Sequence, residues 1–188
     1  MKDWKNISKQ IESLTNKDLV RLVRDLYATN DDNSKFLAAR FLKDKASTKK
    51  YKDQIRAAIY PDYNYGNSDV RIRDAKKAIS EFEKATHNPR QTLDLMIYFL
   101  EVGTEAMEAF GMDYEEFFDS MESMFRRVFT RLKGKDQKLL PVFLKRLRHL
   151  EQASRDTGYG YGDSLADMME DLGESARRQG SAEAANAT

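Results

Sequence analysis

Apolar residues recur with helical spacing along most of the chain. Leu19, Leu22, Val23 and Leu26 follow the i, i+3, i+4, i+7 pattern of one helix face, and Thr15 stands where an N-cap belongs. Comparable stripes follow at 36–42, 51–59, 70–86, 114–132 and 139–150. We find no convincing strand pattern, so the sequence predicts an all-α protein.

Short breaks separate these stripes. Pro61 ends the stripe at 51–59, Asn88 and Pro89 read as an N-cap followed by proline at the first helical position, and Gly134 follows the stripe at 114–132. Pro141 either starts or kinks the helix at 139–150. Short connections favour antiparallel neighbours, so we expect eight or nine helices in an irregular bundle or a short, HEAT/armadillo-like stack of antiparallel helical hairpins.

Two segments stand out from this pattern. The stretch 90–110 is apolar around most of its circumference, which indicates a central helix. At the other extreme, residues 173–188 are small and polar. After the loop TGYGYGD (157–163), Ser164 is a candidate cap for a short helix over 165–172. We therefore expect one helical domain over 1–172 and a flexible polar tail over 173–188.

Composition excludes several kinds of chemistry. The chain has 188 residues, no cysteine and only two histidines, His87 and His149. Disulfides, a thiol nucleophile and thiolate zinc sites are therefore excluded. The N-terminus lacks the apolar core of a signal peptide, and the longest apolar run, 95–100, is far shorter than a membrane span. We expect a soluble, cytoplasmic protein that does not contact a membrane.

The net charge of +1 conceals strong segregation of charge. Residues 1–60 carry +6, residues 61–100 are neutral, residues 101–125 carry −8, residues 126–155 carry +8, and residues 156–188 carry −5. This patterning indicates either internal pairing or distinct surface patches.

The central helix carries acidic residues on one stripe: Asp94, Glu101, Glu105 and Glu108. Clustered carboxylates can bind a hard cation, although no histidine has a glutamate three residues before it, as a ferritin-like di-iron site requires. Negative charge near a helix C-terminus is unfavourable, so Glu105 and Glu108 need an offset. We favour internal pairing or solvation of these carboxylates over a metal site, with the basic helix at 135–148 as the first candidate partner.

Basic residues interleaved with tyrosines suggest a second kind of site. Arg73 and Lys77 share a stripe, and the tyrosines lie in the glycine-containing loops 61–67 and 157–163. Such residues can hold phosphates and stack bases. The sequence pI of about 7.8 is low for a nucleic-acid-binding domain. The glycine loop lacks the lysine of a phosphate-binding loop, so we interpret it as a tight turn whose tyrosines pack on the bundle.

Four segments together resemble one protein family: LTNKDLVRLVRDLYATNDDNSKFLAARFL (14–42), PDYNYGNSDVRIRDAKKAISEFEKATHNP (61–89), DLMIYFLEVG (94–103) with FGMDYEEFFDSMESMF (110–125), and DTGYGYGDSLADMMEDL (156–172). The family comprises small, all-helical bacterial proteins of uncharacterised function, with a YGxxxxRxxxAKKAI segment and a GYGYGD loop. The resemblance implies a helical-hairpin fold and a bacterial cytoplasmic setting. It implies no activity and no catalytic residues.

These observations favour a non-catalytic helical module that binds a protein or peptide partner. The alternatives are RNA or single-stranded DNA binding through the basic helices, and a metal-dependent enzyme that uses the clustered carboxylates. We assign no catalytic, cofactor-binding or metal-binding residue, and the oligomeric state stays open. The candidate interaction surface consists of Tyr63, Tyr65, Arg73, Lys77, Glu101, Glu105, Glu108, Lys138, Lys145, Arg148, Tyr159 and Tyr161.

Overall fold

The computed structural model describes residues 2–42, 45–60, 70–111, 115–155, 157 and 160–186, and this part of the chain is all-helical. Its elements in order are α1 (Lys2–Glu12), α2 (Asn16–Thr29), α3 (Asp31–Phe41), α4 (Lys45–Ile59), α5 (Ile72–Thr86), α6 (Pro89–Phe110), α7 (Glu115–Lys133), a 3₁₀ turn η2 (Gln137–Leu139), α8 (Leu140–Ala153) and α9 (Tyr161–Asn186). The predicted fold class is therefore confirmed.

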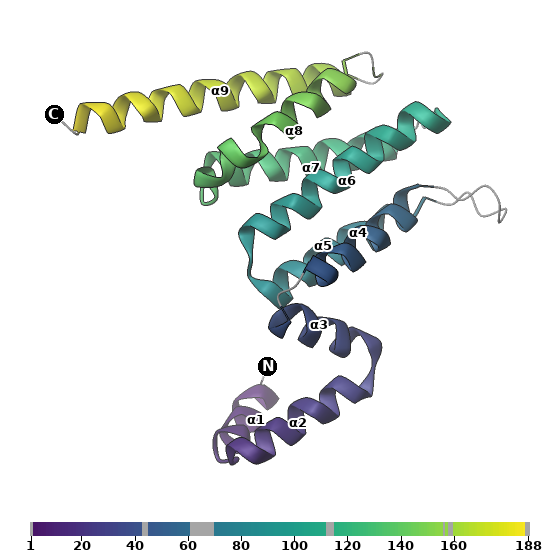
Figure 1. The fold of residues 1–188 in the computed structure, drawn as a ribbon, viewed down its shortest axis with the longest axis vertical. Coiled ribbons are helices and arrows are strands. Elements are labelled where there is room, and N and C mark those ends of the chain that lie inside the picture. Colours follow the sequence, from purple (N-terminus) through teal and green to yellow (C-terminus); the bar gives the residue numbers. More distant parts are fainter. Residues whose placement is uncertain are drawn as a thin grey trace. The chain divides into compact units, whose positions relative to one another are not determined.

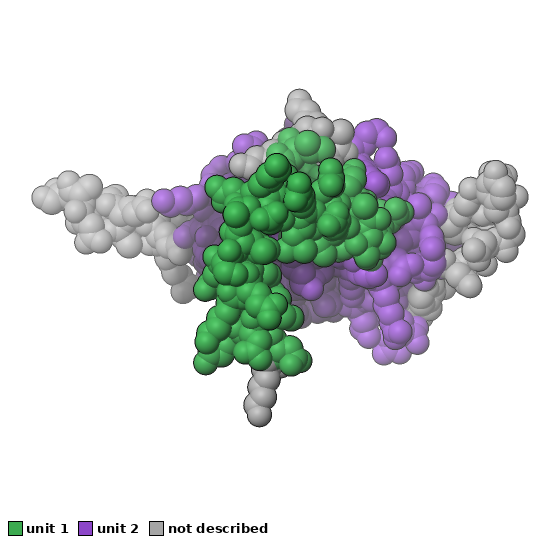
Figure 2. All heavy atoms as spheres, turned by 90° about the horizontal axis from the view of Figure 1, so that it is seen from below, with its two compact units in different colours: residues 1–47 green, residues 48–188 purple. Residues whose placement is uncertain are grey.

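The chain divides into two compact units, residues 1–47 and 48–188 (Figure 2). The sequence analysis expects one domain that ends at residue 172. The structure instead shows two compact units, and α9 continues to Asn186. Polar and small residues such as those of 173–186 have adequate helix propensity even where no apolar stripe marks the helix.

Side-chain caps set the helix boundaries of unit 1. The Thr15 hydroxyl accepts from the amide of Asp18, and the Asn30 side chain accepts from the amide of Asn33 at 2.8 Å. The Asn33 amide group also donates to the Leu26 carbonyl at 2.9 Å, which links α3 to α2. The predicted cap at Thr15 is confirmed.

Unit 2 consists of three helical hairpins in sequence: α4 with α5, α6 with α7, and α8 with α9 (Figure 1). Helix α6 packs against α5, α7 and α8, and α7 packs against α9. The rings of Tyr51 in α4 and Phe82 in α5 meet edge-on at 5.1 Å. Helix α6 thus contacts α8 across the stack, as α7 contacts α9.

Helix α6 is the centre of this stack, as its uniform apolarity predicts. Asn88 caps it, Pro89 lies in its first turn, and Gly111 ends it in the left-handed conformation with φ of 61°. Leu93, Leu95, Met96, Ile97, Phe99 and Leu100 are fully buried. Gly103 leaves room for the Met121 thioether of α7, so the two helices approach closely at this point.

The structure also settles two details that the sequence left open. Pro141 lies in the first turn of α8, so it starts that helix and does not kink it. Ser164 does not cap a helix, because α9 already begins at Tyr161; its hydroxyl instead donates to Glu122 of α7 at 3.0 Å.

The close packing around Gly162, in the first turn of α9, predicts that a larger residue there destabilises the protein. A Cβ on Gly162 would overlap the Ser154 carbonyl oxygen and lie 2.9 Å from the Arg155 carbonyl oxygen. Backbone atoms cannot move aside as a flexible side chain can, so we expect Gly162→Ala to destabilise unit 2 by about 2 kcal/mol and to lower Tm by roughly 5 °C. Thermal unfolding measures this. Ala166→Ser, at an exposed position of the same helix, is the control, and an unchanged Tm for Gly162→Ala would contradict the packing described.

Candidate interaction surfaces

Three carboxylates of α6 face the two neighbouring helices α4 and α8. Asp94, Glu101 and Glu105 are spaced by seven and four residues, so they lie along one side of the helix. Each of them forms an ion pair with a cation from α4 or α8. We call these residues and their cationic partners Lys52, Arg56 and Arg146 the α6 charge seam.

Arg146 of α8 is the most connected member of the seam. Its Nε and Nη2 donate to the two oxygens of Glu101, each at 2.7 Å, and its Nη1 donates to Asp94. The second Asp94 oxygen lies 2.8 Å from Nζ of Lys52 in α4. The Arg146 and Asp94 side chains are only 30% and 26% exposed. A fork-shaped bidentate pair of this kind fixes geometry as well as charge.

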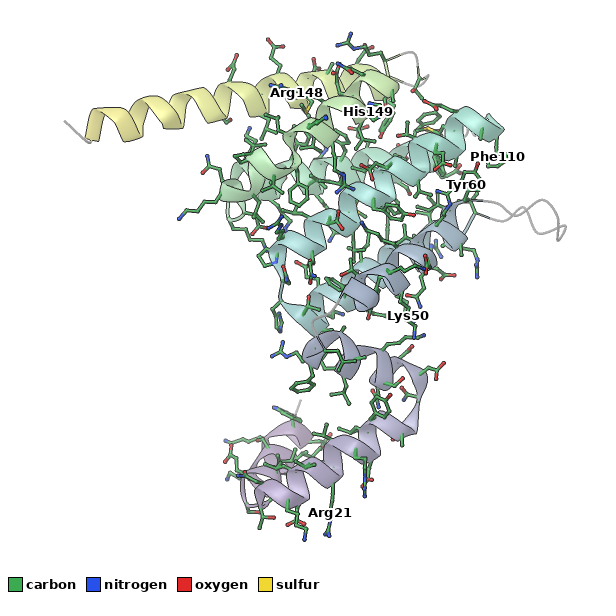
Figure 3. All side chains as sticks on the ribbon, viewed as in Figure 1. Arg21, Lys50, Tyr60, Phe110, Arg148 and His149 are labelled. Carbon is green, nitrogen blue, oxygen red and sulfur yellow. The ribbon has the colours of Figure 1, made fainter. Side chains whose placement is uncertain are left out.

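Arg56, the second cation that α4 contributes to the seam, contacts the C-terminal half of α6. Both Nη atoms of Arg56 donate to Glu105, at 2.8 and 2.7 Å. The Arg56 guanidinium also lies 4.5 Å from the centre of the Tyr60 ring. That ring meets Phe110 edge-on at 4.8 Å, where α4 and α6 end (Figure 3). Aromatic and ionic contacts therefore support each other at this end of the hairpin stack.

The seam lowers the pKa of two of its carboxylates, Asp94 and Glu105. Burial alone would raise the pKa of Asp94, but hydrogen bonds from Lys52 and Arg146 outweigh burial and leave the pKa below its ordinary value. The hydrogen bonds from Arg56 lower the pKa of Glu105 in the same way. Asp94 and Glu105 are thus held as anions by cations of the same chain.

This arrangement decides between the two interpretations of the acidic stripe. Internal pairing, the interpretation favoured from the sequence, holds for Asp94, Glu101 and Glu105. Only Arg146 of the predicted basic helix takes part, and the partner of Glu105 comes from α4 instead. Within the described residues no group of three or more histidine and carboxylate side chains is placed to hold a metal ion.

The remaining predicted surface residues do not form one site. Glu108, Lys138, Lys145 and Arg148 are exposed and make no ion pair with a described residue; Figure 3 shows Arg148 on α8. Tyr161 is buried, with its ring 5.8 Å from that of Phe118, so it is not a surface residue. Tyr63, Tyr65 and Tyr159 lie outside the described residues.

The predicted residues Arg73 and Lys77 both lie on α5, and both are exposed. Lys77 is 3.5 Å from Glu81. Arg73 lines a surface cavity of about 570 Å³ between the N-terminal halves of α5 and α7. A second cavity, of about 470 Å³, lies further along the same two helices and is lined by Glu83, Arg126, Arg127 and Lys135, among others. We call the two cavities together the α5–α7 groove.

The groove brings together cations that are far apart in the sequence. Arg131 of α7 bonds to Glu83 of α5 at 2.6 Å and also to Asp136. Partial burial and the nearby charge of Arg127 lower the pKa of Lys76. Sequence reasoning missed this site. Nothing in the local sequence signals that the basic end of α7 faces α5.

Unit 1 differs from unit 2 because it leaves many large apolar side chains exposed. Among its described residues only Ala39 is buried. The exposed large apolar side chains are Trp4, Ile7, Leu14, Val20, Leu22, Val23, Leu26, Tyr27, Phe36, Phe41 and Leu42. Val20, Phe41 and Leu42 are the extreme cases, each about two-thirds exposed or more.

Comparisons with known proteins add no constraint. No family model, no curated protein and no solved structure matches the chain. The family resemblance noted from the sequence therefore stays a prediction. No helix in the described part of the chain is both long and apolar enough to cross a membrane.

The seam predicts a specific pH dependence of stability. Because the pKa of Asp94 is lowered in the folded state, its ion pairs contribute fully above the ordinary aspartate pKa and are lost as pH falls through the lowered value. We expect Asp94→Asn to cost about 1–2 kcal/mol at pH 6, with this difference shrinking toward zero below about pH 4. Urea unfolding across this pH range measures it. Asp53→Asn, on the exposed side of α4, is the control. A cost for Asp94→Asn that does not change with pH would contradict the assignment.

Proposed function

We propose that this protein is a non-catalytic helical interaction module that binds a partner protein through the apolar faces of α1–α3. The observation that carries the proposal is the number of large apolar side chains that unit 1 leaves exposed. Covering one such side chain contributes about 1.5–3 kcal/mol, so a unit whose described residues include one buried side chain, an alanine, leaves most of its available stabilisation unused.

The spacing of these side chains defines the kind of partner. Leu19, Leu22, Val23 and Leu26 form a stripe on α2 with the period of an α-helix, and Leu22, Val23 and Leu26 are 36%, 41% and 47% exposed. Ridges with this period fit the grooves of another helix. The partner that suits this face is therefore an amphipathic helix of another protein.

The alternatives have different support. A metal-dependent enzyme would need carboxylates that Lys52, Arg56 and Arg146 already engage. RNA or single-stranded DNA binding keeps support from the cations of the α5–α7 groove, and the experiment in the next section addresses it. We also propose that the protein acts in the bacterial cytoplasm, as the family resemblance implies.

Substitution of the α2 stripe tests this proposal. We expect Leu22→Ser with Leu26→Ser to reduce recovery of the partner by about tenfold or more, because two apolar anchors are lost from the interface. Quantitative affinity purification of wild type and variant measures the recovery. Arg24→Ser with Ala28→Ser, on the polar side of the same helix, is the matched control. Circular dichroism checks that each variant keeps its helix content.

Two outcomes would contradict the proposal. The first is recovery of the same partners by the wild-type protein and the stripe variant. The second is a concentration-dependent dimer in light scattering that the stripe variant abolishes, because a second copy of the chain would then occupy this face in place of a different protein.

A further inference from the structure

Helices α5 and α7 form a basic face whose charges are only partly compensated. Seven of the residues that line the α5–α7 groove are cationic and three are acidic. Arg71, Arg126 and Arg131 pair with Asp74, Glu122 and Glu83, respectively. Arg73, Lys76, Arg127 and Lys135 make no ion pair with a described residue. The groove therefore keeps a surplus of positive charge, in contrast to the neutralised α6 charge seam.

Lys76 and Arg127 form the centre of this surplus. They come from different helices and line different cavities, yet the charge of Arg127 lowers the pKa of the half-buried Lys76, after the larger effect of burial. Two cations held close together repel each other unless an anion lies between them. Lys76 lines one cavity and Arg127 lines the other, and neither makes an ion pair with a described residue, so the two cavities are suited to receive anionic groups.

The two cavities differ in one respect. Beside its charged and polar residues, the lining at the N-terminal ends of α5 and α7 includes the apolar side chains Val70 and Ile72. The described lining of the other cavity includes no apolar residue. Hydroxyl groups of Ser120, Ser123 and Thr130 lie along α7 in the lining of the two cavities. From Glu116 to Arg131 the helix rises about 22 Å, which matches roughly seven residues of extended peptide.

From this arrangement we propose that the α5–α7 groove binds an extended acidic segment of a partner protein, with an apolar side chain at the Val70 end and carboxylates at Lys76, Arg127 and Lys135. This site is separate from the apolar face of unit 1 and goes beyond the function proposed for that face.

A peptide fits the groove better than a nucleic acid does. Phe117, the one aromatic residue that lines the groove in the described part of the chain, is fully buried, so bases find no stacking platform there. Asp74, Glu83 and Glu116 would repel a continuous phosphate backbone. A sugar–phosphate chain has no apolar group to place against Val70 and Ile72. An acidic peptide can supply both a leucine for this position and carboxylates for the cations.

Fluorescence anisotropy with a defined probe tests the proposal. The probe is a labelled acidic peptide of about seven residues with glutamates at one end and a leucine at the other, sized to the groove. The matched probe replaces each glutamate by glutamine. We expect wild-type protein at low salt to bind the acidic peptide at least about tenfold more tightly than the glutamine peptide, and to lose this preference as salt is raised.

Two triple variants locate the site. We expect Lys76→Gln, Arg127→Gln and Lys135→Gln together to weaken binding of the acidic peptide by about tenfold or more, because they remove three uncompensated charges. The control, Lys138→Gln, Lys145→Gln and Arg148→Gln, removes the same charge from exposed positions of η2 and α8 and should change binding by less than about twofold.

Three results would overturn the proposal: no binding of the acidic peptide at low salt, equal loss in both triple variants, or a single-stranded RNA of similar length that binds more tightly than the peptide and is lost in the groove variant. The last result would assign the groove to nucleic acid. The groove variant should still recover the partner bound by unit 1, so failure of this proposal is distinguishable from failure of the function proposed above.

Discussion

The arrangement of unit 2 depends on Arg146. This side chain forms a bidentate ion pair with Glu101 and a further hydrogen bond to Asp94. It joins α8 to α6, and through the second oxygen of Asp94 it reaches Lys52 of α4. Three helices from three successive hairpins therefore share one charge network. The apolar core of α6 supplies the bulk of the stabilisation, but apolar contacts alone allow neighbouring helices to slide. Directional ion pairs with partial burial fix how the hairpins align.

The same network sorts the charged residues of unit 2 into two groups. Asp94, Glu101 and Glu105 of α6 are paired with cations of α4 and α8, which leaves the α6 charge seam close to neutral. The α5–α7 side retains Arg73, Lys76, Arg127 and Lys135, none of which makes an ion pair with a described residue. Because the chain satisfies one side internally and not the other, the open side is where an external anion would gain most.

Much of the fold could be predicted from the sequence, because helix caps and apolar periodicity are local signals. Thr15 and Asn88 lie at helix ends as expected, and α6 is central as its uniform apolarity indicates. The extension of α9 to Asn186 was missed, since small and polar residues give no periodic signal. The division into two units was also missed, because the apolar stripes of α2 and α4 look alike and do not reveal which one becomes buried.

The interaction surfaces were harder to predict, because they depend on contacts distant in sequence. Internal pairing of the acidic stripe followed from the helix dipole, but the partner of Glu105 is Arg56, 49 residues earlier. A double-mutant cycle on Arg146→Met and Glu101→Gln, read by urea unfolding, tests the central claim most directly. We predict a coupling energy of about 1–2 kcal/mol between the two side chains. Either single substitution already breaks the ion pair, so the double substitution should cost less than the sum of the two. Additive effects, with a coupling near zero, would contradict the view that this pair aligns the hairpins.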